Sequence, residues 1–196
     1  MKTLSITGSL ILLTLASSCS TNQELIKRLS ISSRQDVVRT LSRKERAPAG
    51  YADLNIYASL KLHKPGAHSA MDMHGSPDYR LLLNIDGQVV ELAAATRSEN
   101  NEARYLNDPE TGEGIRYRFA KGIRIKAGTH KVAVILPADG IAVEREITLT
   151  DGKGSTLTVE PIYGAVPGKR GPGFYGATSF NGGIRSIRLL LDGRVP

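Results

Sequence analysis

The stretch ADLNIYASLKL, residues 52–62, decides the fold class of this chain. Its apolar side chains occupy every second position, and the positions between them carry polar or amphipathic side chains. Successive side chains of an extended strand point to opposite faces, so this alternation places the apolar groups together on one face. The stretch therefore predicts a β-strand that is buried on one side and exposed to water on the other.

The same alternation recurs along the rest of the chain, in segments separated by turn residues. The segments are residues 80–86, 88–92, 115–119, 123–126, 130–136, 141–149, 155–159 and 187–191. Asp86-Gly87, between the first two of them, supplies the positive φ angles of a tight hairpin. After residue 50 no segment shows a sustained helical period. Eight or nine short strands of this kind predict an all-β fold, an antiparallel β-sandwich.

Composition limits the classes of protein to which the chain can belong. The sequence has 196 residues, a formal net charge of +7, one Cys and no Trp. One domain with a short tail is expected at this length. A single Cys excludes an internal disulfide and a multi-cysteine zinc or iron–sulfur site.

The N-terminus has the pattern of an export signal. Lys2 precedes an apolar run from Leu4 to Leu15 that carries no charge. A basic start followed by a short apolar run is typical of a secretory signal peptide, and this run is shorter than the roughly 18 residues that span a bilayer. Its end, LASSC, resembles a bacterial lipoprotein signal. That resemblance implies that residues 1–18 are a signal peptide and that cleavage leaves Cys19 as an acylated first residue.

Two other interpretations of this segment stay open. Ala16 and Ser18 would also suit ordinary signal cleavage of a secreted protein, and Cys19 would otherwise be a buried structural thiol. A lone thiol has no partner in an oxidising compartment, and acylation removes that liability, so lipidation is favoured. Ser20 follows the Cys, which by the same resemblance implies sorting to the outer membrane. Acyl chains hold a domain on a bilayer without a spanning helix.

Residues 19–50 are expected to form a basic stalk between the anchor and a β-sandwich domain, residues 51–196. The stalk carries seven basic and three acidic residues, a charge of +4, and the domain carries 18 basic and 16 acidic residues, a charge of +2. Positive charge beside a lipid anchor suits an anionic membrane surface, and a solvated tether is the alternative. Export, the near-neutral domain and the scarcity of aromatic residues disfavour nucleic acid as a partner. Apolar patches at helical spacing, within residues 25–29 and 37–41, indicate one or two short amphipathic helices.

Residues 123–163 resemble a PEGA-type surface module. The resemblance is carried by KAGTHKV at residues 126–132, EITL at 146–149, a Gly-rich turn and TLTV at 156–159. PEGA-type modules are small Ig-like or prealbumin-like β-sandwich units of bacterial envelope and surface-layer proteins, so the resemblance implies such a sandwich at the cell envelope. The whole chain also resembles uncharacterised bacterial lipoproteins that share the stretch GEGIRY, residues 112–117, and that have no assigned activity.

The segment after the first strand has the character of a metal site. Six candidate ligands fall within twelve positions: His63, His68, Met71, Asp72, Met73 and His74. Imidazole and thioether groups suit copper, and Asp72 would suit zinc instead. The spacing fits no metal-ligand motif, and the Pro and Gly residues around it are typical of an exposed loop. An ordinary loop is therefore favoured over a metal site.

A second candidate region is the Gly-rich segment 163–183. It lacks the Gly-Lys-Ser/Thr of a phosphate-binding loop, and the chain has neither a Gly-x-Ser-x-Gly nor a His-Glu-x-x-His motif, so an enzyme is not expected. Long loops in compact domains are often functional. Five side chains of this segment are candidates for contacts with a partner: Lys169, Arg170, Phe174, Tyr175 and Phe180.

These features together predict a non-catalytic envelope lipoprotein without a cofactor. Its β-sandwich is expected to present loops to a protein or glycan partner at the outer membrane, on the periplasmic or the surface face. The alternative is a periplasmic copper-binding lipoprotein that uses the His and Met residues within 63–74. The pattern indicates no particular oligomeric state.

Overall fold

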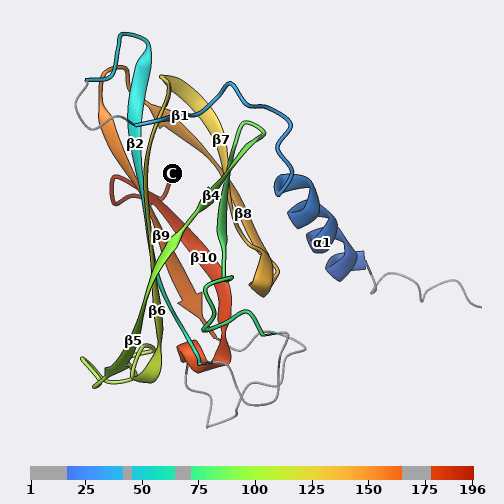
Figure 1. The fold of residues 1–196 in the computed structure, drawn as a ribbon, viewed down its shortest axis with the longest axis vertical. Helices are drawn as coiled ribbons and strands as arrows, with labels where there is room; N and C mark the ends of the chain where they lie inside the picture. Colours follow the sequence, from blue (N-terminus) through green and yellow to red (C-terminus); the bar gives the residue numbers. More distant parts are fainter. Residues whose placement is uncertain (1–16, 42–45, 65–71, 165–177) are drawn as a thin grey trace, which may run out of the picture.

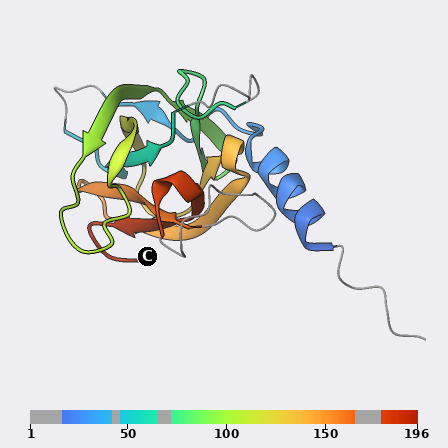
Figure 2. The same ribbon diagram turned by 90° about the horizontal axis from the view of Figure 1, so that it is seen from below.

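The computed structural model describes residues 17–41, 46–64, 72–164 and 178–196, and these form two facing β-sheets and one α-helix (Figure 1). Sheet A has the strand order β1-β6-β2-β9-β10, and β5 pairs with β6. Sheet B has the order β4-β3-β7-β8. Seen from below, the sheets form two layers, and helix α1 lies outside them (Figure 2).

The elements have the following bounds: α1 Ser17–Leu29, β1 Arg39–Thr40, β2 Tyr51–Leu62, β3 Leu81–Ile85, β4 Gln88–Leu92, β5 Ala94–Asn101, β6 Gly112–Lys126, β7 Gly128–Leu136, η1 Pro137–Asp139, β8 Ile141–Leu149, β9 Gly154–Tyr163, η2 Phe180–Gly182 and β10 Ile184–Leu191, where η marks a short 3-10 helix.

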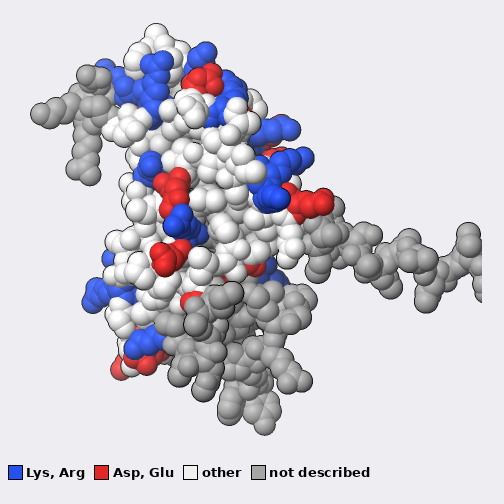
Figure 3. Space-filling view, turned by 45° about the vertical axis from the view of Figure 1, so that its right-hand side comes forward, with Lys and Arg blue, Asp and Glu red and all other residues white. Residues whose placement is uncertain are grey.

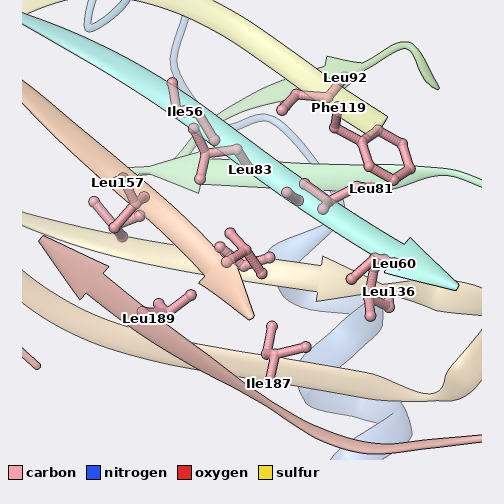
Figure 4. Close-up of a cluster of buried hydrophobic side chains, with 14 of the residues drawn as sticks. Ile56, Leu60, Leu81, Leu83, Leu92, Phe119, Leu136, Leu157, Ile187 and Leu189 are labelled. Carbon is pink, nitrogen blue, oxygen red and sulfur yellow. The ribbon is translucent and has the colours of Figure 1, made fainter. Parts of the chain in front are cut away.

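The core lies between the sheets and is centred on β2, the strand that the alternating stretch predicts. β2 pairs with β6 in antiparallel register, with Leu54 opposite Ile123, and its even-numbered side chains are buried. The two sheets pack face to face because the alternate side chains on their inner faces are apolar and are buried between them. Figure 4 labels part of this core: Ile56, Leu60, Phe119, Leu157, Ile187 and Leu189 from sheet A, and Leu81, Leu83, Leu92 and Leu136 from sheet B.

The predicted β-sandwich is confirmed, and its strand pairs are antiparallel with one exception among the described residues. β2 and β9 run parallel, from Asp53 opposite Gly154 to Ala58 opposite Val159. Six strands lie between β2 and β9 in the chain, so no hairpin joins them. Their relative direction is therefore not constrained by a tight turn.

Two strands differ from the prediction. The predicted segments 115–119 and 123–126 are parts of one strand, β6, of 15 residues. The sequence does not predict β5, because AATRSENN has no apolar alternation. β5 forms at the edge of sheet A, where it pairs with β6 from Ala94 opposite Phe119 to Asn101 opposite Gly112. Backbone pairing with a long neighbour thus replaces the buried face that a strand usually needs.

Helix α1 packs on the outer face of sheet B. Its side chains Leu25 and Ile26 lie four and three positions before Leu29, on the same face of the helix, and the three cover Ala133 and Ile135 of β7. Figures 1 and 2 show α1 beside sheet B, with its first turn projecting away from the sandwich. Among the described residues, no helix has the length and hydropathy needed to cross a bilayer.

The chain between α1 and β1 also lies on the sandwich. The backbone N–H groups of Val37 and Val38 both donate to Gln88 Oε1 at 2.8 Å, and both side chains pack against the core. Gln88 thus satisfies these N–H groups, and the segment enters β1 through bends at residues 35–37, without a second helix. Within the expected stalk, residues 19–50, the described chain from Leu25 to Val38 therefore contacts the sandwich.

We expect Leu29→Ala to lower the free energy of unfolding by about 2–3 kcal/mol, because it empties a buried contact between α1 and sheet B. Urea unfolding of the purified protein, followed by circular dichroism, measures this change. Ile31→Ala is the matched control, since Ile31 is exposed, and it should cost less than about 0.5 kcal/mol. Equal effects of the two substitutions would show that α1 does not pack on the sandwich in solution.

Candidate functional site

Two clusters of polar side chains lie at the end of the sandwich where β2 ends, which is the lower end in Figure 1. The first contains His63 and side chains that precede β3. The second surrounds the connection between β5 and β6. On the face shown in Figure 3, basic side chains gather toward the upper end with acidic ones among them, and the two signs lie next to one another lower down. Each of the two polar clusters is a candidate site.

The first cluster joins two histidines through one carboxylate. Asp72 Oδ2 lies 2.8 Å from His63 Nε2, and Asp72 Oδ1 lies 2.8 Å from His74 Nδ1. The backbone N–H of His74 also donates to Asp72 Oδ1, at 3.0 Å. One ligand atom from each of the three side chains lies within 4.8 Å of the other two. Two imidazole nitrogens and a carboxylate oxygen are thus close enough together to hold one metal ion.

A second carboxylate holds His74 from the core side. His74 Nε2 lies 3.2 Å from Oδ1 of Asp139, whose side chain is only 2% exposed. The hydroxyl of Tyr79 donates to Asp139 Oδ2 at 2.6 Å. Burial, and next the charge of Asp139, raise the pKa of Tyr79 far above its usual value, so the hydroxyl keeps its proton. The His74 ring is therefore fixed between two carboxylates.

The Asp72 carboxyl group is held in its ionised form. Partial burial acts to raise its pKa, but the hydrogen bonds with the His63 ring and the His74 backbone N–H outweigh burial. The pKa of Asp72 therefore lies below its ordinary value. In this form the group can accept hydrogen bonds from both imidazoles or coordinate a cation.

The structure brings together part of the predicted ligand set. His63 and His74 meet at the carboxylate, whereas the side chain of Met73 is 43% exposed. His68 and Met71 lie outside the described residues. Among the described residues, the donors that meet are therefore nitrogen and oxygen.

Sequence reasoning missed Asp139 and Tyr79. Asp139 is 65 positions away from His74 and stands in η1, where no local pattern marks it as part of a site. Tyr79 is close in sequence, but a single Tyr before a strand is indistinguishable from an ordinary core residue. Only the pairing of β3 with β7 brings the two side chains together.

The second cluster fixes residues 102–111, which we call the β5–β6 loop. The buried Asp108 carboxylate accepts hydrogen bonds from the backbone N–H and the Nε of Arg104, at 3.1 and 2.8 Å. It also accepts one from the backbone N–H of Glu110, at 3.0 Å. Three donors on one buried carboxylate give the loop a defined shape.

The tip of the β5–β6 loop carries two large exposed side chains, Tyr105 at 59% and Leu106 at 90% exposure. The next residue, Asn107, has a φ of 62°, a left-handed conformation that Asn tolerates better than most residues. The backbone N–H of Asp108 donates to the Tyr105 carbonyl oxygen at 3.1 Å and closes the turn. The two side chains are thus held outward by a turn of fixed shape.

Buried ion pairs support this loop from below. Arg116 donates to both carboxylate oxygens of Glu110, at 2.8 and 2.7 Å, and to Glu99 at 3.1 Å. The Tyr163 hydroxyl donates to Glu110 at 2.9 Å, and Lys61 Nζ donates to the Glu110 carbonyl oxygen at 2.7 Å. Burial acts to raise the pKa of Glu110, but the hydrogen bonds from Arg116 and Tyr163 outweigh it and lower the pKa.

The predicted contact residues of the Gly-rich segment require a correction. Four of them lie outside the described residues: Lys169, Arg170, Phe174 and Tyr175. Phe180 is described, and its ring is fully buried, with Lys61 Nζ 4.7 Å from the ring centroid. Gly114 makes room for this ring, since a Cβ there would lie 2.7 Å from Phe180 Cε2. Phe180 is therefore a core residue and not a surface contact.

We expect the ion pairs below the loop to make the protein sensitive to acid. The pKa of Glu110 in the fold lies below that in the unfolded chain, about 4.3, so ionised Glu110 stabilises the fold. This contribution is complete above about pH 5 and is lost as the pH falls through the folded pKa. Glu110→Gln should lower the free energy of unfolding at neutral pH by about 2–3 kcal/mol, because Arg116 stays buried beside a neutral group. The free energy of unfolding of this variant should also fall less steeply as the pH is lowered.

Urea unfolding at a series of pH values measures both effects. Glu102→Gln is the control, because Glu102 is exposed, and it should keep the pH dependence of the unsubstituted protein. A Glu110→Gln variant with an equally steep loss of stability on acidification would contradict the assignment.

No family model, curated protein or solved structure matches this chain. The resemblances to lipoprotein signals and to PEGA-type modules stay predictions.

Proposed function

We propose that this chain is a non-catalytic envelope lipoprotein, anchored to the outer membrane through an acylated Cys19, and that its sandwich presents the β5–β6 loop to a protein partner. The observation that carries the proposal is the exposure of Tyr105 and Leu106 on a loop whose shape Asp108 fixes. The proposed partner surface is thus the β5–β6 loop, and not the Gly-rich segment 163–183 that supplies the contact residues expected from the sequence.

A fixed loop with exposed apolar groups suits association. Ordering a loop on binding costs free energy, and a loop that is already ordered avoids this cost. Tyr is enriched among the residues that contribute most to protein interfaces. Burial of Leu106 against a partner would favour association, because burying a Leu side chain contributes roughly 1.5–3 kcal/mol of free energy. The two neighbouring side chains can act together as one anchor.

The chemistry of the loop favours a protein over a glycan. Leu106 has no group that can form hydrogen bonds with sugar hydroxyls. Two of the polar groups nearby, the Arg104 guanidinium and the Asp108 carboxylate, already bond to each other. An apolar pocket on a protein surface is the complement that this tip requires.

The position of α1 supports an anchoring role. Cys19 lies in the first turns of α1, and Leu25, where the helix contacts the sandwich, is six positions further on. Six positions span about 9 Å along a helix. Acyl chains on Cys19 would hold the sandwich close to the bilayer surface, so the partner would be met near the membrane.

We expect Cys19→Ala to move the protein from the membrane fraction to the soluble periplasmic fraction and to abolish incorporation of labelled palmitate. Fractionation and labelling of cells that express each variant measure this. Ser18→Ala is the control, because it keeps the acceptor Cys and a small residue before it, and it should stay in membranes. Recovery of Cys19→Ala in membranes at the unsubstituted level would sink the anchoring proposal.

We expect a photoreactive amino acid at position 106 to give a discrete crosslinked product with one envelope protein in living cells. The same amino acid at position 57 is the control, since Tyr57 is also exposed but lies on the outer face of sheet A. Asp108→Ala should reduce the yield at position 106, because the loop loses the acceptor that fixes it. Identical products from positions 57 and 106, or a product that glycosidases remove, would refute the protein partner.

A further inference from the structure

The His63–Asp72–His74 cluster is a set of donors that converge on one point. Asp72 lies within hydrogen-bond distance of both rings, and the ring centroids of the two histidines are 4.9 Å apart. In a tetrahedral zinc site with bonds of 2.0–2.2 Å, neighbouring ligand atoms are about 3.4 Å apart. The two contacts of 2.8 Å are made to different oxygens of Asp72, so the contact to the oxygen that binds the ion would have to lengthen by roughly half an ångström. The ligand atoms of the three side chains already lie within 4.8 Å of one another.

The surroundings of His74 are a second and independent observation. A histidine that ligates a metal through one ring nitrogen usually donates its other ring N–H to a carboxylate, which fixes its tautomer and orientation. Asp139 Oδ1 is placed for this role, 3.2 Å from His74 Nε2. Tyr79, itself buried, fixes the other oxygen of Asp139. With Nε2–H donated to Asp139, His74 Nδ1 faces Asp72 and becomes a metal ligand when a cation displaces the proton that it shares with that carboxylate.

The exposure of the side chains shows which side of the cluster faces solvent. The Asp139 side chain is almost fully covered, whereas that of His63 is 34% exposed. The cluster thus has a closed side toward the core and an open side toward solvent. A cation can enter from the open side, and three protein ligands leave one tetrahedral position for water or an external ligand.

From these observations we infer that His63 Nε2, an oxygen of Asp72 and His74 Nδ1 form a binding site for Zn²⁺, with Asp139 and Tyr79 as the outer shell that orients His74. The site is independent of the proposed partner loop, and either can fail without the other. Zinc replaces the proton that otherwise bridges each imidazole and Asp72.

The donor types select the metal class. Two imidazole nitrogens and one carboxylate oxygen are a set that zinc accepts, whereas calcium and magnesium require mostly oxygen ligands. Copper(I) prefers thioether sulfur, and Met73, the one candidate thioether in the described part of the chain, is exposed. Copper(II) binds nitrogen–oxygen sites more tightly than zinc by its general affinity order, so it should compete for the same residues.

The test is titration of the full-length protein, purified in detergent and stripped of metal, with Zn²⁺ alone. Calorimetry should give one Zn²⁺ per chain, and thermal unfolding should move to higher temperature as Zn²⁺ is added. His63→Ala and Asp72→Asn should each weaken binding at least 100-fold. Asp139→Asn should weaken it about 10- to 100-fold, because it removes only the outer-shell acceptor. Cobalt(II) should report a tetrahedral site in its visible spectrum.

Two variants separate the alternatives. Met73→Leu should bind Zn²⁺ as the unsubstituted protein does, and so should His130→Ala, which removes a histidine bonded to Asp86 outside the cluster. His63→Ala removes a partly exposed side chain, so it keeps the test valid if substitutions closer to the core unfold the protein. Absence of stoichiometric Zn²⁺ binding, or binding that His63→Ala and Asp72→Asn leave unchanged, would overturn the inference and leave the cluster a structural ion pair. Copper(I) binding that Met73→Leu abolishes, with no Zn²⁺ binding, would overturn it in favour of a thioether site.

Discussion

The burial of one face of β2 is the constraint on which the rest of this structure depends. β2 is paired on both sides, with β6 and with β9, and its inward side chains lie in the core between the sheets. A slip by one residue would turn every one of these side chains toward solvent. The register is therefore strongly determined, and it also determines where β2 ends. Lys61 stands near the end of this strand and His63 directly follows it, so both lie at the end of the sandwich where both polar clusters form.

The polar clusters show how a sandwich of this size can carry charge inside. Lys61 is fully buried, and its Nζ donates to the carbonyl oxygens of Glu110 and Gly112. Burial, and next the charge of Arg116, lower the pKa of Lys61. Buried charges are costly unless hydrogen bonds compensate them. Here the compensating acceptors are backbone carbonyl oxygens at the end of the β5–β6 loop. The hydrogen bonds that stabilise the buried Lys61 therefore also fix this end of the loop.

The N-terminal segment packs on the outside of the sandwich. α1 covers apolar side chains on the outer face of sheet B, which would otherwise face water. The segment after it is fixed by the Gln88 side chain and by the pairing of β1 with β6. The residue proposed as the lipid anchor is therefore joined to the body by a helix and not by a long free tether. With the proposed acylation of Cys19, this arrangement would restrict the distance between the sandwich and a bilayer.

The sequence by itself determined the strands, because an alternation of period two is a local property that burial imposes on each segment separately. It also marked His63 and His74 as candidate ligands and the Asp86-Gly87 turn as a hairpin, since both are short-range features. It could not predict β5, whose only requirement is the backbone edge of β6.

Only the tertiary structure decided which distant residues meet. Asp139 reaches His74 through the pairing of β3 with β7, and Phe180 enters the core through the space that Gly114 leaves. The packing of α1 on sheet B likewise depends on which strands expose Ala133 and Ile135. The physical reason is the same in each case: strand order sets contacts between residues far apart in the chain, and no local pattern of side chains encodes strand order.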